Sequence, residues 1–420
     1  MAFRMIIILL GAVGFSCLSA QNAEDFDHDF NVAVKQVALV YAYLDEKATR
    51  WEDMPALYAG DLRQVTTRDH FISLLERVVD ELYDHHAHLT VNLETSPRLV
   101  PSGTDLWAEW RDGRATITQV RSGSEAERAG IGYGTIVLSI DGIPISEAVG
   151  SRLGRSYPDS TTAARNWALR AVLAGRHHAG RILQIEEHGV SRTVDLPSPA
   201  QSAGFSETLE ASEIRPGIGY IRLNDSLGNS ATVAAFDHAL ETLRQTSGLI
   251  VDLRDTPSGG NSSVARGILG RFVDRAQPYQ KHVLPSEGRA TGIQRSWLEL
   301  VSPRGDFVYS QPIAVLVNRW TGSMGEGLAI GFDATGAATV VGTEMAGLVG
   351  ATTRISLPRT EIGINLPSER LYHIDGTPRE TFQPAVLVEV GGAHSERDPF
   401  IEAALEVLMG GEWSDRLRSQ

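Results

Sequence analysis

The sequence is short of two residue types, cysteine and lysine. Among its 420 residues the only cysteine is Cys17, and the only lysines are Lys35, Lys47 and Lys281. One cysteine cannot form a disulfide within the chain, which excludes a disulfide framework. The formal net charge is −14 at pH 7, and there is no Lys/Arg-rich run. Because nucleic-acid binding needs a basic surface that neutralises phosphates, we expect no nucleic-acid partner.

Long apolar runs are also missing. After the first 20 residues, no run reaches the roughly 18 apolar residues of a membrane helix, so we expect no transmembrane helix in the mature chain. At the start, Arg4 precedes an apolar stretch at 5–15 and small residues at 19–20, an order typical of a secretory signal peptide. We therefore expect an exported protein, periplasmic or secreted. Lipoprotein processing at Cys17 is the alternative, although residues 14–16 are a poor context for lipid attachment.

The rest of the chain divides by its hydrophobic periodicity. A length of 420 residues predicts two or three domains. Apolar residues recur every three or four positions within 26–98, which predicts an N-terminal helical segment. Alternation and turn pairs within 99–200, including a strand at 115–120 and a hairpin pair at 141–142, predict a small β domain.

Residues 207–400 have the pattern of an α/β core. The segments 248–253 and 312–317 are apolar throughout and alternate with helical segments such as 326–335. Strands without polar alternation are buried on both faces, so we expect a parallel or mixed sheet covered by helices. Residues 401–420 are predicted to form a C-terminal helix and tail. The predicted fold class is therefore mixed α/β.

A candidate nucleophile lies where the apolar strand at 312–317 gives way to a helix. Ser323 is flanked by Gly322 and Gly325 and is followed by Glu326. A serine on a strand-to-helix turn is exposed, the helix N-terminus behind it favours developing negative charge, and glycines let a substrate backbone approach. The alternative is a helix N-cap, where serine is common.

A second candidate segment follows the strand at 248–253. Residues 252–261 form a loop that contains Gly259 and Gly260. Backbone amides in such a loop can point at one oxygen and form an oxyanion hole. A phosphate-binding loop is set aside because no Gly-Lys-Ser/Thr follows, and a plain structural turn remains the alternative.

The third candidate segment is a histidine cluster, with His85, His86 and His88 within residues 84–89. Histidine changes charge near neutral pH, so one of them is a candidate general base. Two histidines at i and i+2 on a strand share a face, so a metal hydrolase that uses His86 and His88 is an alternative. No second cluster with ligand spacing accompanies them, so we predict no metal and no cofactor. Solvated surface histidines are the remaining interpretation.

Together these segments resemble the S41 serine peptidases, the family of the C-terminal processing peptidases and the tricorn core protease. The resemblance lies in the order of four motifs along the chain. They are a strand and loop at 249–260, a turn at 315–326, a strand segment at 340–347 and a late segment at 366–380. The resemblance implies a peptidase core with a crotonase-like α/β sheet, an N-terminal helical segment and an inserted PDZ-like β domain.

The PDZ-like part of the resemblance lies in residues 122–142, where a turn, a short helix, a second turn and a strand follow one another. A generic small β domain is the alternative. A PDZ domain binds peptide by adding a strand to a sheet edge. The resemblance therefore implies that this domain selects or admits the C-terminal tails of protein or peptide substrates.

The scarcity of lysine bears on which catalytic arrangement of the resembled family applies. The processing peptidases pair their serine with a lysine just after the third motif strand, but residues 342–347 contain none. Arginine stays protonated and cannot replace lysine as a base. The tricorn-like branch uses a serine, a histidine and a glutamate, which the resemblance places at Ser323, His86 and Glu380. That branch has a serine before its histidine, whereas this chain has His85.

The resemblance implies an exported serine endopeptidase that cleaves peptide bonds through an acyl-enzyme on Ser323. His86 is the expected general base, and Glu380 is the expected orienting carboxylate. The expected oxyanion hole consists of the backbone amides of Met324, Gly259 and Gly260. The auxiliary candidates are Asp84, His85 and Glu326. The alternative function is a non-catalytic peptide- or lipophile-binding protein on the same fold.

Overall fold

The computed structural model describes residues 22–156, 161–198, 206–391 and 397–410. The predicted signal peptide, with Cys17, lies outside the described residues, as does the end of the predicted C-terminal tail. Within the described ranges, no helix is long and apolar enough to cross a membrane.

Helices form the N-terminal part of the chain, as the periodicity predicts. Asn22 and Thr67 precede two of them, and their side chains accept hydrogen bonds from first-turn amides. The apolar faces of the helices pack together and against strand β16 (Gly363–Tyr372). The helices are α1 (Ala23–Val40), α2 (Met54–Leu62) and α3 (Arg68–Asp80), with 3-10 turns at Leu44–Glu46 and Trp51–Asp53.

The next part is an antiparallel sheet with three helices, which we call the middle unit (residues 106–196). Its strand order is β2-β3-β4-β6-β7, with β5 paired to β4, and α6 packs along the edge strand β2. The strands are β2 (Leu106–Arg111), β3 (Arg114–Val120), β4 (Ile136–Ile140), β5 (Ile143–Pro144), β6 (Arg181–Glu187) and β7 (Val190–Leu196). The helices are α4 (Glu125–Arg128), α5 (Ile145–Arg152) and α6 (Thr162–Ala174).

The C-terminal half contains the predicted α/β core. Its six-stranded sheet has the order β17-β14-β13-β10-β9-β8, and every pair except β8–β9 is parallel. All positions of β10 and β13 are buried, because helices cover both faces. The strands are β8 (Leu209–Arg215), β9 (Ile218–Leu223), β10 (Gly248–Asp252), β13 (Ile313–Val317), β14 (Thr339–Gly342) and β17 (Val386–Leu387). The helices are α7 (Ala231–Thr242), α8 (Ser262–Leu269), α10 (Met324–Ala334) and α11 (Pro399–Leu408).

A second sheet of this half joins the N-terminal part of the chain to the C-terminal half. Its order is β1-β16-β11-β12, with β15 also paired to β16. Because β1 pairs with β16, the segment that follows the histidine cluster is fixed to a strand nearly three hundred residues later. The elements are β1 (His88–Leu89), β11 (Gln277–Leu284), α9 (Pro285–Thr291), β12 (Arg295–Val301) and β15 (Ala351–Ser356), with a late 3-10 turn at Arg379–Thr381.

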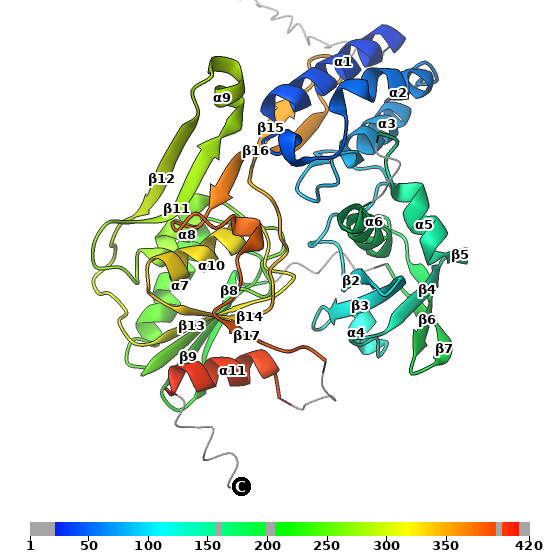
Figure 1. Ribbon diagram of the computed structural model, residues 1–420. Helices are drawn as coiled ribbons and strands as arrows, with labels where there is room; N and C mark the ends of the chain where they lie inside the picture. The colour runs from blue at the N-terminus through cyan, green and yellow to red at the C-terminus, as the bar shows by residue number, and fades with distance from the viewer. Residues whose placement is uncertain (1–21, 157–160, 199–205, 392–396, 411–420) are drawn as a thin grey trace, which may run out of the picture.

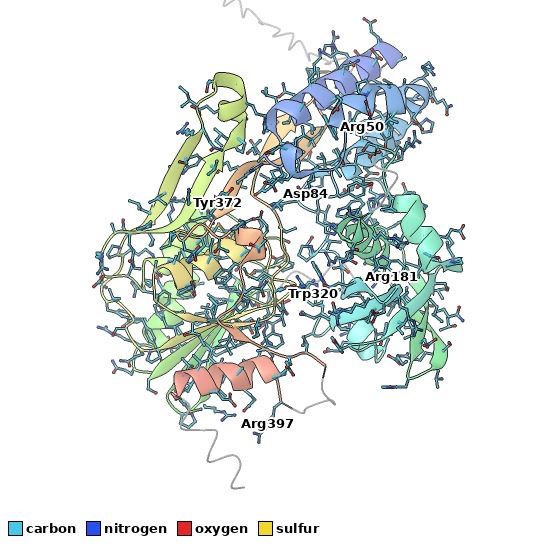
Figure 2. The ribbon with its side chains drawn as sticks, in the orientation of Figure 1. Arg50, Asp84, Arg181, Trp320, Tyr372 and Arg397 are labelled. Carbon is cyan, nitrogen blue, oxygen red and sulfur yellow. The ribbon has the colours of Figure 1, made fainter. Side chains whose placement is uncertain are left out.

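The three parts meet around one region. In Figure 1 the N-terminal helices and the middle unit lie on one side of the molecule, and the α/β core lies on the other. Figure 2 shows Trp320, which follows β13, at the boundary between the core and the middle unit, with Asp84 above it. The Trp320 indole N–H donates to the Thr104 carbonyl oxygen at 2.8 Å, which fastens this boundary.

The mixed α/β prediction is confirmed, and two local expectations are corrected. The helix expected at 326–335 begins at Met324, because Ser323 is itself the residue that precedes its first turn. His86 does not share a strand with His88: β1 starts at His88, and His86 lies in the turn before it.

Candidate active site

Ser323 occupies a strained turn between β13 and α10. Its backbone has φ of 51°, which is rare for a residue with a side chain and costs about 1–3 kcal/mol unless neighbours hold it. Thr321 braces the turn, since its hydroxyl accepts the Asn318 N–H at 3.0 Å. Ser323 is partly exposed, whereas the α10 residues from Met324 to Phe332 are buried. The strand-to-helix turn therefore presents the serine at the N-terminus of a buried helix.

The glycine loop lies against this turn. Gly259 has φ of 67°, and a Cβ there would lie 2.4 Å from Ser323 Cβ and 2.9 Å from the Met324 backbone nitrogen. A bridge between Thr256 and Thr321 joins the loop to the turn. The close approach explains why this position has no side chain.

The three expected oxyanion donors differ in availability. The Gly259 amide already donates to the Thr256 carbonyl oxygen at 3.2 Å. For Met324 and Gly260, the hydrogen bonds recorded among the described residues leave the amides uncommitted. The Met324 and Gly260 amides are therefore the two without a recorded partner in the described ranges, and Gly259 provides the close contact between the two segments.

His86 is held in one orientation by backbone and carboxylate groups. Its Nδ1 lies 2.8 Å from the Val349 carbonyl oxygen, which can only accept, so Nδ1 carries the proton and Nε2 is free to accept one. The Asp84 carboxylate accepts the His86 backbone N–H at 2.8 Å and the Tyr41 hydroxyl at 2.7 Å. Burial lowers the pKa of His86 to about 4, so the imidazole is neutral at neutral pH.

Residues 347–350, which we call the linking segment, contact both the serine turn and the histidine. Glu326 is fully buried and accepts the Ser323 amide at 2.8 Å and the Gly347 amide at 2.9 Å. Arg379 donates to the Leu348 and Gly350 carbonyl oxygens at 2.8 and 2.9 Å. Burial raises the pKa of Glu326 to about 7, although Arg379, 3.8 Å away, favours the ionised form.

Glu380 lies in the same region without a bond to the histidine. Its Oε2 is buried and, among the described residues, has no hydrogen-bond partner. Burial raises the pKa of its carboxyl. The hydrogen bonds recorded in the described part of the chain do not join Ser323 to His86, or His86 to Glu380. The linking segment, rather than a chain of side-chain hydrogen bonds, joins these parts of the site.

The other two histidines have separate surroundings. His85 stacks on Trp167 of α6, with ring centroids 5.6 Å apart and planes inclined by 22°. His88 Nε2 lies 3.1 Å from the Asn365 side-chain nitrogen. Across the described ranges, no group of three His, Cys, Asp or Glu side chains is placed to hold a metal ion.

Two contacts of this site were not anticipated from the sequence. They are the Val349 carbonyl, which fixes the His86 tautomer, and the buried Arg379, which fixes the linking segment. A backbone carbonyl has no residue-type signature, so nothing at Val349 predicted its role. Arg379 precedes Glu380 in a predicted motif, but sequence alone does not indicate that a guanidinium there is buried.

Comparisons with known proteins agree with the fold and the motif order. Residues 217–387 match peptidase family S41. A carboxyl-terminal-processing protease of Synechocystis sp. is 24% identical over 358 residues, covering 82% of this chain and 77% of that protein. Similar solved structures include mature CPAF (16% identity, 94% of this chain and 96% of that chain, TM-score 0.59). The photosystem II D1 C-terminal processing protease is another (18% identity, 92% and 97%, TM-score 0.55).

The chain therefore carries a peptidase domain of family S41 and is a serine-type peptidase. It is a homologue of the carboxyl-terminal-processing proteases, and its substrate class is protein or peptide. The solved structures support the mixed α/β fold.

Proposed function

We propose that this chain is an exported endopeptidase in which Ser323 is the nucleophile and His86 is the general base. The observation that carries the proposal is the linking segment. Its Val349 carbonyl holds the His86 imidazole, while its Gly347 amide and the Ser323 amide share the Glu326 carboxylate. One short segment thus sets the position of base and nucleophile together, although they are 237 residues apart in sequence (323 − 86).

The reaction follows acyl transfer. His86 Nε2 takes the hydroxyl proton as Ser323 Oγ attacks a peptide carbonyl carbon, and the protonated imidazole then gives that proton to the leaving amine. The Met324 and Gly260 amides receive the charge that develops on the carbonyl oxygen. His86 then takes a proton from water as that water attacks the ester carbonyl carbon, and the imidazole returns the proton to Ser323 Oγ as the acid product leaves.

The two glutamates of the site, Glu326 and Glu380, have different roles in this proposal. Glu326 keeps the strained Ser323 turn in place through the backbone, so it is a positioning residue. Glu380 acts on His86 through the electrostatic field of the site, because the Nδ1–H is already given to Val349. Tight closure around substrate would bring it nearer. A lysine base is not part of the proposal, since the segment after β14 has none.

We also propose that the middle unit is PDZ-like and meets substrate tails. A substrate tail would pair with its edge strand β2 as an additional strand of the sheet. However, α6 already covers that edge. The Asn166 side-chain oxygen accepts the Trp110 amide at 2.8 Å, and Arg170 donates to the Ala108 carbonyl oxygen at 3.3 Å. A tail that binds at β2 must therefore displace these two side chains.

The test is turnover of an unfolded protein, together with labelling by a serine-reactive fluorophosphonate. Ser323→Ala and His86→Ala are each expected to lower turnover by about 10³-fold or more, and Ser323→Ala abolishes labelling. Glu380→Gln is expected to cost less, because no direct hydrogen bond to His86 is lost. Matched controls are Ser296→Ala on β12 and His70→Ala on α3, both exposed in the fold.

Full turnover in Ser323→Ala would exclude the proposed nucleophile. Full turnover in His86→Ala would leave the serine peptidase intact but remove its proposed base. A wild-type chain that neither cleaves nor labels, yet binds peptides or lipophilic compounds, would favour the non-catalytic alternative. The alternative is retained because no hydrogen bond recorded among the described residues joins Ser323 to His86, as expected for a protein that only binds.

A further inference from the structure

We propose that Trp167, on α6 of the middle unit, is a positioning residue for His86 and acts through the two aromatic residues Tyr83 and His85. The inference rests on the proposed role of His86 as the base. It assigns the middle unit a task besides meeting substrate tails: it holds the loop that carries the base.

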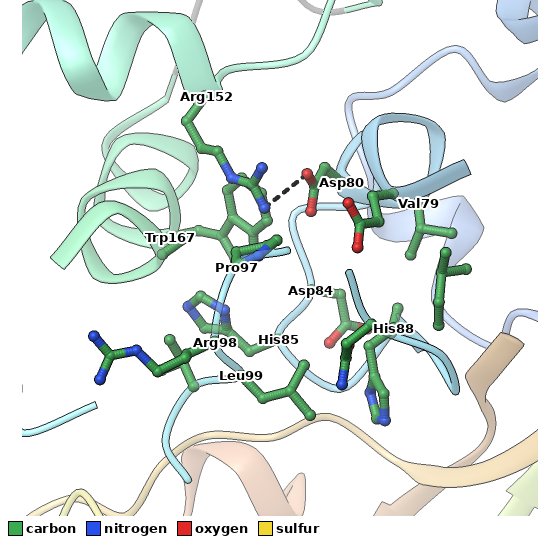
Figure 3. Close-up of a pocket in the computed structure, with 16 residues that line it drawn as sticks. Val79, Asp80, Asp84, His85, His88, Pro97, Arg98, Leu99, Arg152 and Trp167 are labelled. Atoms are coloured by element: carbon green, nitrogen blue, oxygen red, sulfur yellow. Dashed lines mark ion pairs between the residues drawn. The ribbon is translucent and has the colours of Figure 1, made fainter. Parts of the chain in front are cut away.

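Trp167 contacts the loop on both sides of Asp84. Its ring stacks on His85 at 5.6 Å and meets the Tyr83 ring edge-on at 5.3 Å, with planes inclined by 86°. Such pairs have preferred geometries, so they fix the orientation of the rings as well as bury them. Figure 3 shows Trp167 and Arg152 reaching toward the loop that carries Asp84 and His85. Trp167 itself is 6% exposed, so its own position is fixed by packing.

The loop needs such support because its backbone is strained. Tyr83 has φ of 46°, in the left-handed region that residues with side chains avoid. Its hydroxyl accepts the Gly154 amide, at 2.8 Å, and Arg152 forms an ion pair with Asp80 at 2.8 Å. All of these partners belong to the middle unit or to the segment that follows α5. Without them, relaxation of Tyr83 would move Asp84 and the His86 amide that it accepts.

The N-terminal core holds both ends of this loop through the buried Leu82, Ala87 and Leu89, but His85 between them lies beside a gap. A cavity of about 60 Å³ borders the same loop, and its lining includes Asp84, His85 and Trp167. A side chain beside a cavity lacks contacts on that side and can shift into it. The stack on Trp167 is therefore the aromatic contact that fixes His85, next to the His86 imidazole that Val349 orients.

The predicted effect falls on turnover rather than on binding. A displacement of about 1 Å at a catalytic group can cost about 100-fold in rate. We expect Trp167→Ala to lower kcat by about 10- to 100-fold with KM changed less than about threefold, while Trp167→Phe, which keeps an aromatic ring, restores most of kcat. We expect His85→Ala to lower kcat as well, and His85→Phe to restore most of it. The His85 pair keeps the test decisive if Trp167→Ala does not fold.

A matched control exists elsewhere in the chain. Trp297 on β12 stacks on His282, with centroids 4.8 Å apart and planes inclined by 16°. Trp297→Ala removes the same kind of contact outside the base loop, so kcat should stay within about twofold of wild type. Melting temperatures of both tryptophan variants show how much of any loss is general destabilisation.

A double mutant shows whether Trp167 affects the rate through His86 or independently of it. If Trp167 acts through His86, adding Trp167→Ala to His86→Ala should change the residual rate by less than about twofold, because the base is already absent. If the losses of rate from the two substitutions multiply in the double mutant, the proposal is wrong. It is also wrong if a folded Trp167→Ala protein keeps the kcat of wild type. Retained activity in His86→Ala alone would instead overturn the proposed function.

One readout does not depend on activity. Modification of His86 by diethylpyrocarbonate, followed by mass spectrometry, reports how accessible the imidazole is. We expect Trp167→Ala to raise that rate at least about fivefold and Trp297→Ala to leave it unchanged, because loosening of the loop exposes a buried ring. An unchanged rate in Trp167→Ala would contradict the positioning role even if the chain proved to be inactive.

Discussion

The turn that carries Ser323 and the loop that carries His86 are both strained, but their supports come from different places. Ser323 is held from within the core, by Gly259, by Thr321 and by the Glu326 carboxylate three residues later. The loop of His86 takes its contacts from an N-terminal tyrosine, from the linking segment and from the middle unit. The proposed nucleophile is thus held by one part of the fold, and the proposed base by three.

This difference indicates which part of the site responds to changes elsewhere. Strain held by short-range neighbours persists as long as the core is folded, whereas a loop held by several parts of the chain moves when any one of them moves. We therefore expect the nucleophile turn to be sensitive to local changes only. The base loop should be sensitive to distant ones, including changes in the middle unit.

Among changes that keep both Ser323 and His86, the largest expected effect comes from adding one methyl group beside Ser323. Gly259→Ala places a Cβ 2.4 Å from Ser323 Cβ at a backbone φ of 67°. Either the glycine loop or the serine turn must shift, and the oxyanion donors shift with it. We expect kcat/KM to fall by about 10²–10³-fold, the cost of losing an oxyanion donor. Steady-state kinetics on an unfolded protein substrate measures this.

The control for that variant is Gly292→Ala at the end of α9. Gly292 also has a positive φ, 76°, but a Cβ there meets no atom within 4 Å. It carries the same conformational cost, about 1 kcal/mol, without the collision. Equal losses of activity in the two variants would show that backbone strain alone explains Gly259, and that its contact with Ser323 is unimportant.

Glu326→Gln tests the contact that the two sides share. The carboxylate accepts the Ser323 and Gly347 amides through different oxygens, whereas a glutamine offers one oxygen and turns an N–H₂ group toward the other donor. We expect kcat to fall by about 10- to 100-fold, because the serine turn is no longer held in place against the linking segment. Glu241→Gln, on the exposed face of α7, is the matched control. Unchanged kcat in a folded Glu326→Gln protein would break the proposed link.

The pH dependence addresses the base side alone. Burial disfavours the charged imidazole, which lowers the pKa of His86 to about 4. His86 therefore stays neutral, and able to accept a proton, well below the ordinary histidine pKa of about 6.5. Because burial raises the pKa of Glu326 to about 7, the profile is measured in Glu326→Gln, which removes that titration. In this variant we expect kcat/KM to stay nearly constant from about pH 8 down to about pH 5.5 and to fall below that. Circular dichroism over the same range confirms that the chain remains folded. A half-maximal value near pH 6.5 would place the base in a more exposed site than this structure has.

The surroundings of Ser323 were easier to predict from the sequence than the supports of His86, for a physical reason. Continuous apolar strands and the glycines at 259–260 are local patterns, so the sheet and the turn at Ser323 follow from neighbouring residues. The supports of His86 are a carbonyl at Val349, the ring of Trp167 and the hydroxyl of Tyr41. Each is far away in sequence, and none has a pattern that marks its role. The orienting role expected of Glu380, directly or through an intermediary, likewise depends on long-range geometry, and in the structure the Val349 carbonyl oxygen lies at His86 Nδ1.

The smallest expected effect separates the middle unit's support of the proposed base from its edge strand β2. Asn166 lies on α6, as Trp167 does, but its side-chain oxygen accepts the Trp110 amide of β2. Asn166→Ala should therefore lower the free energy of unfolding by about 1 kcal/mol and leave kcat within about twofold of wild type. If substrate tails add to β2, the freed amide should also lower KM for substrates with a free C-terminus. Chemical denaturation and steady-state kinetics on paired substrates, with free and amidated C-termini, measure both. A fall in kcat as large as that of Trp167→Ala would mean that α6 supports the base as a whole helix, and not through the ring of Trp167.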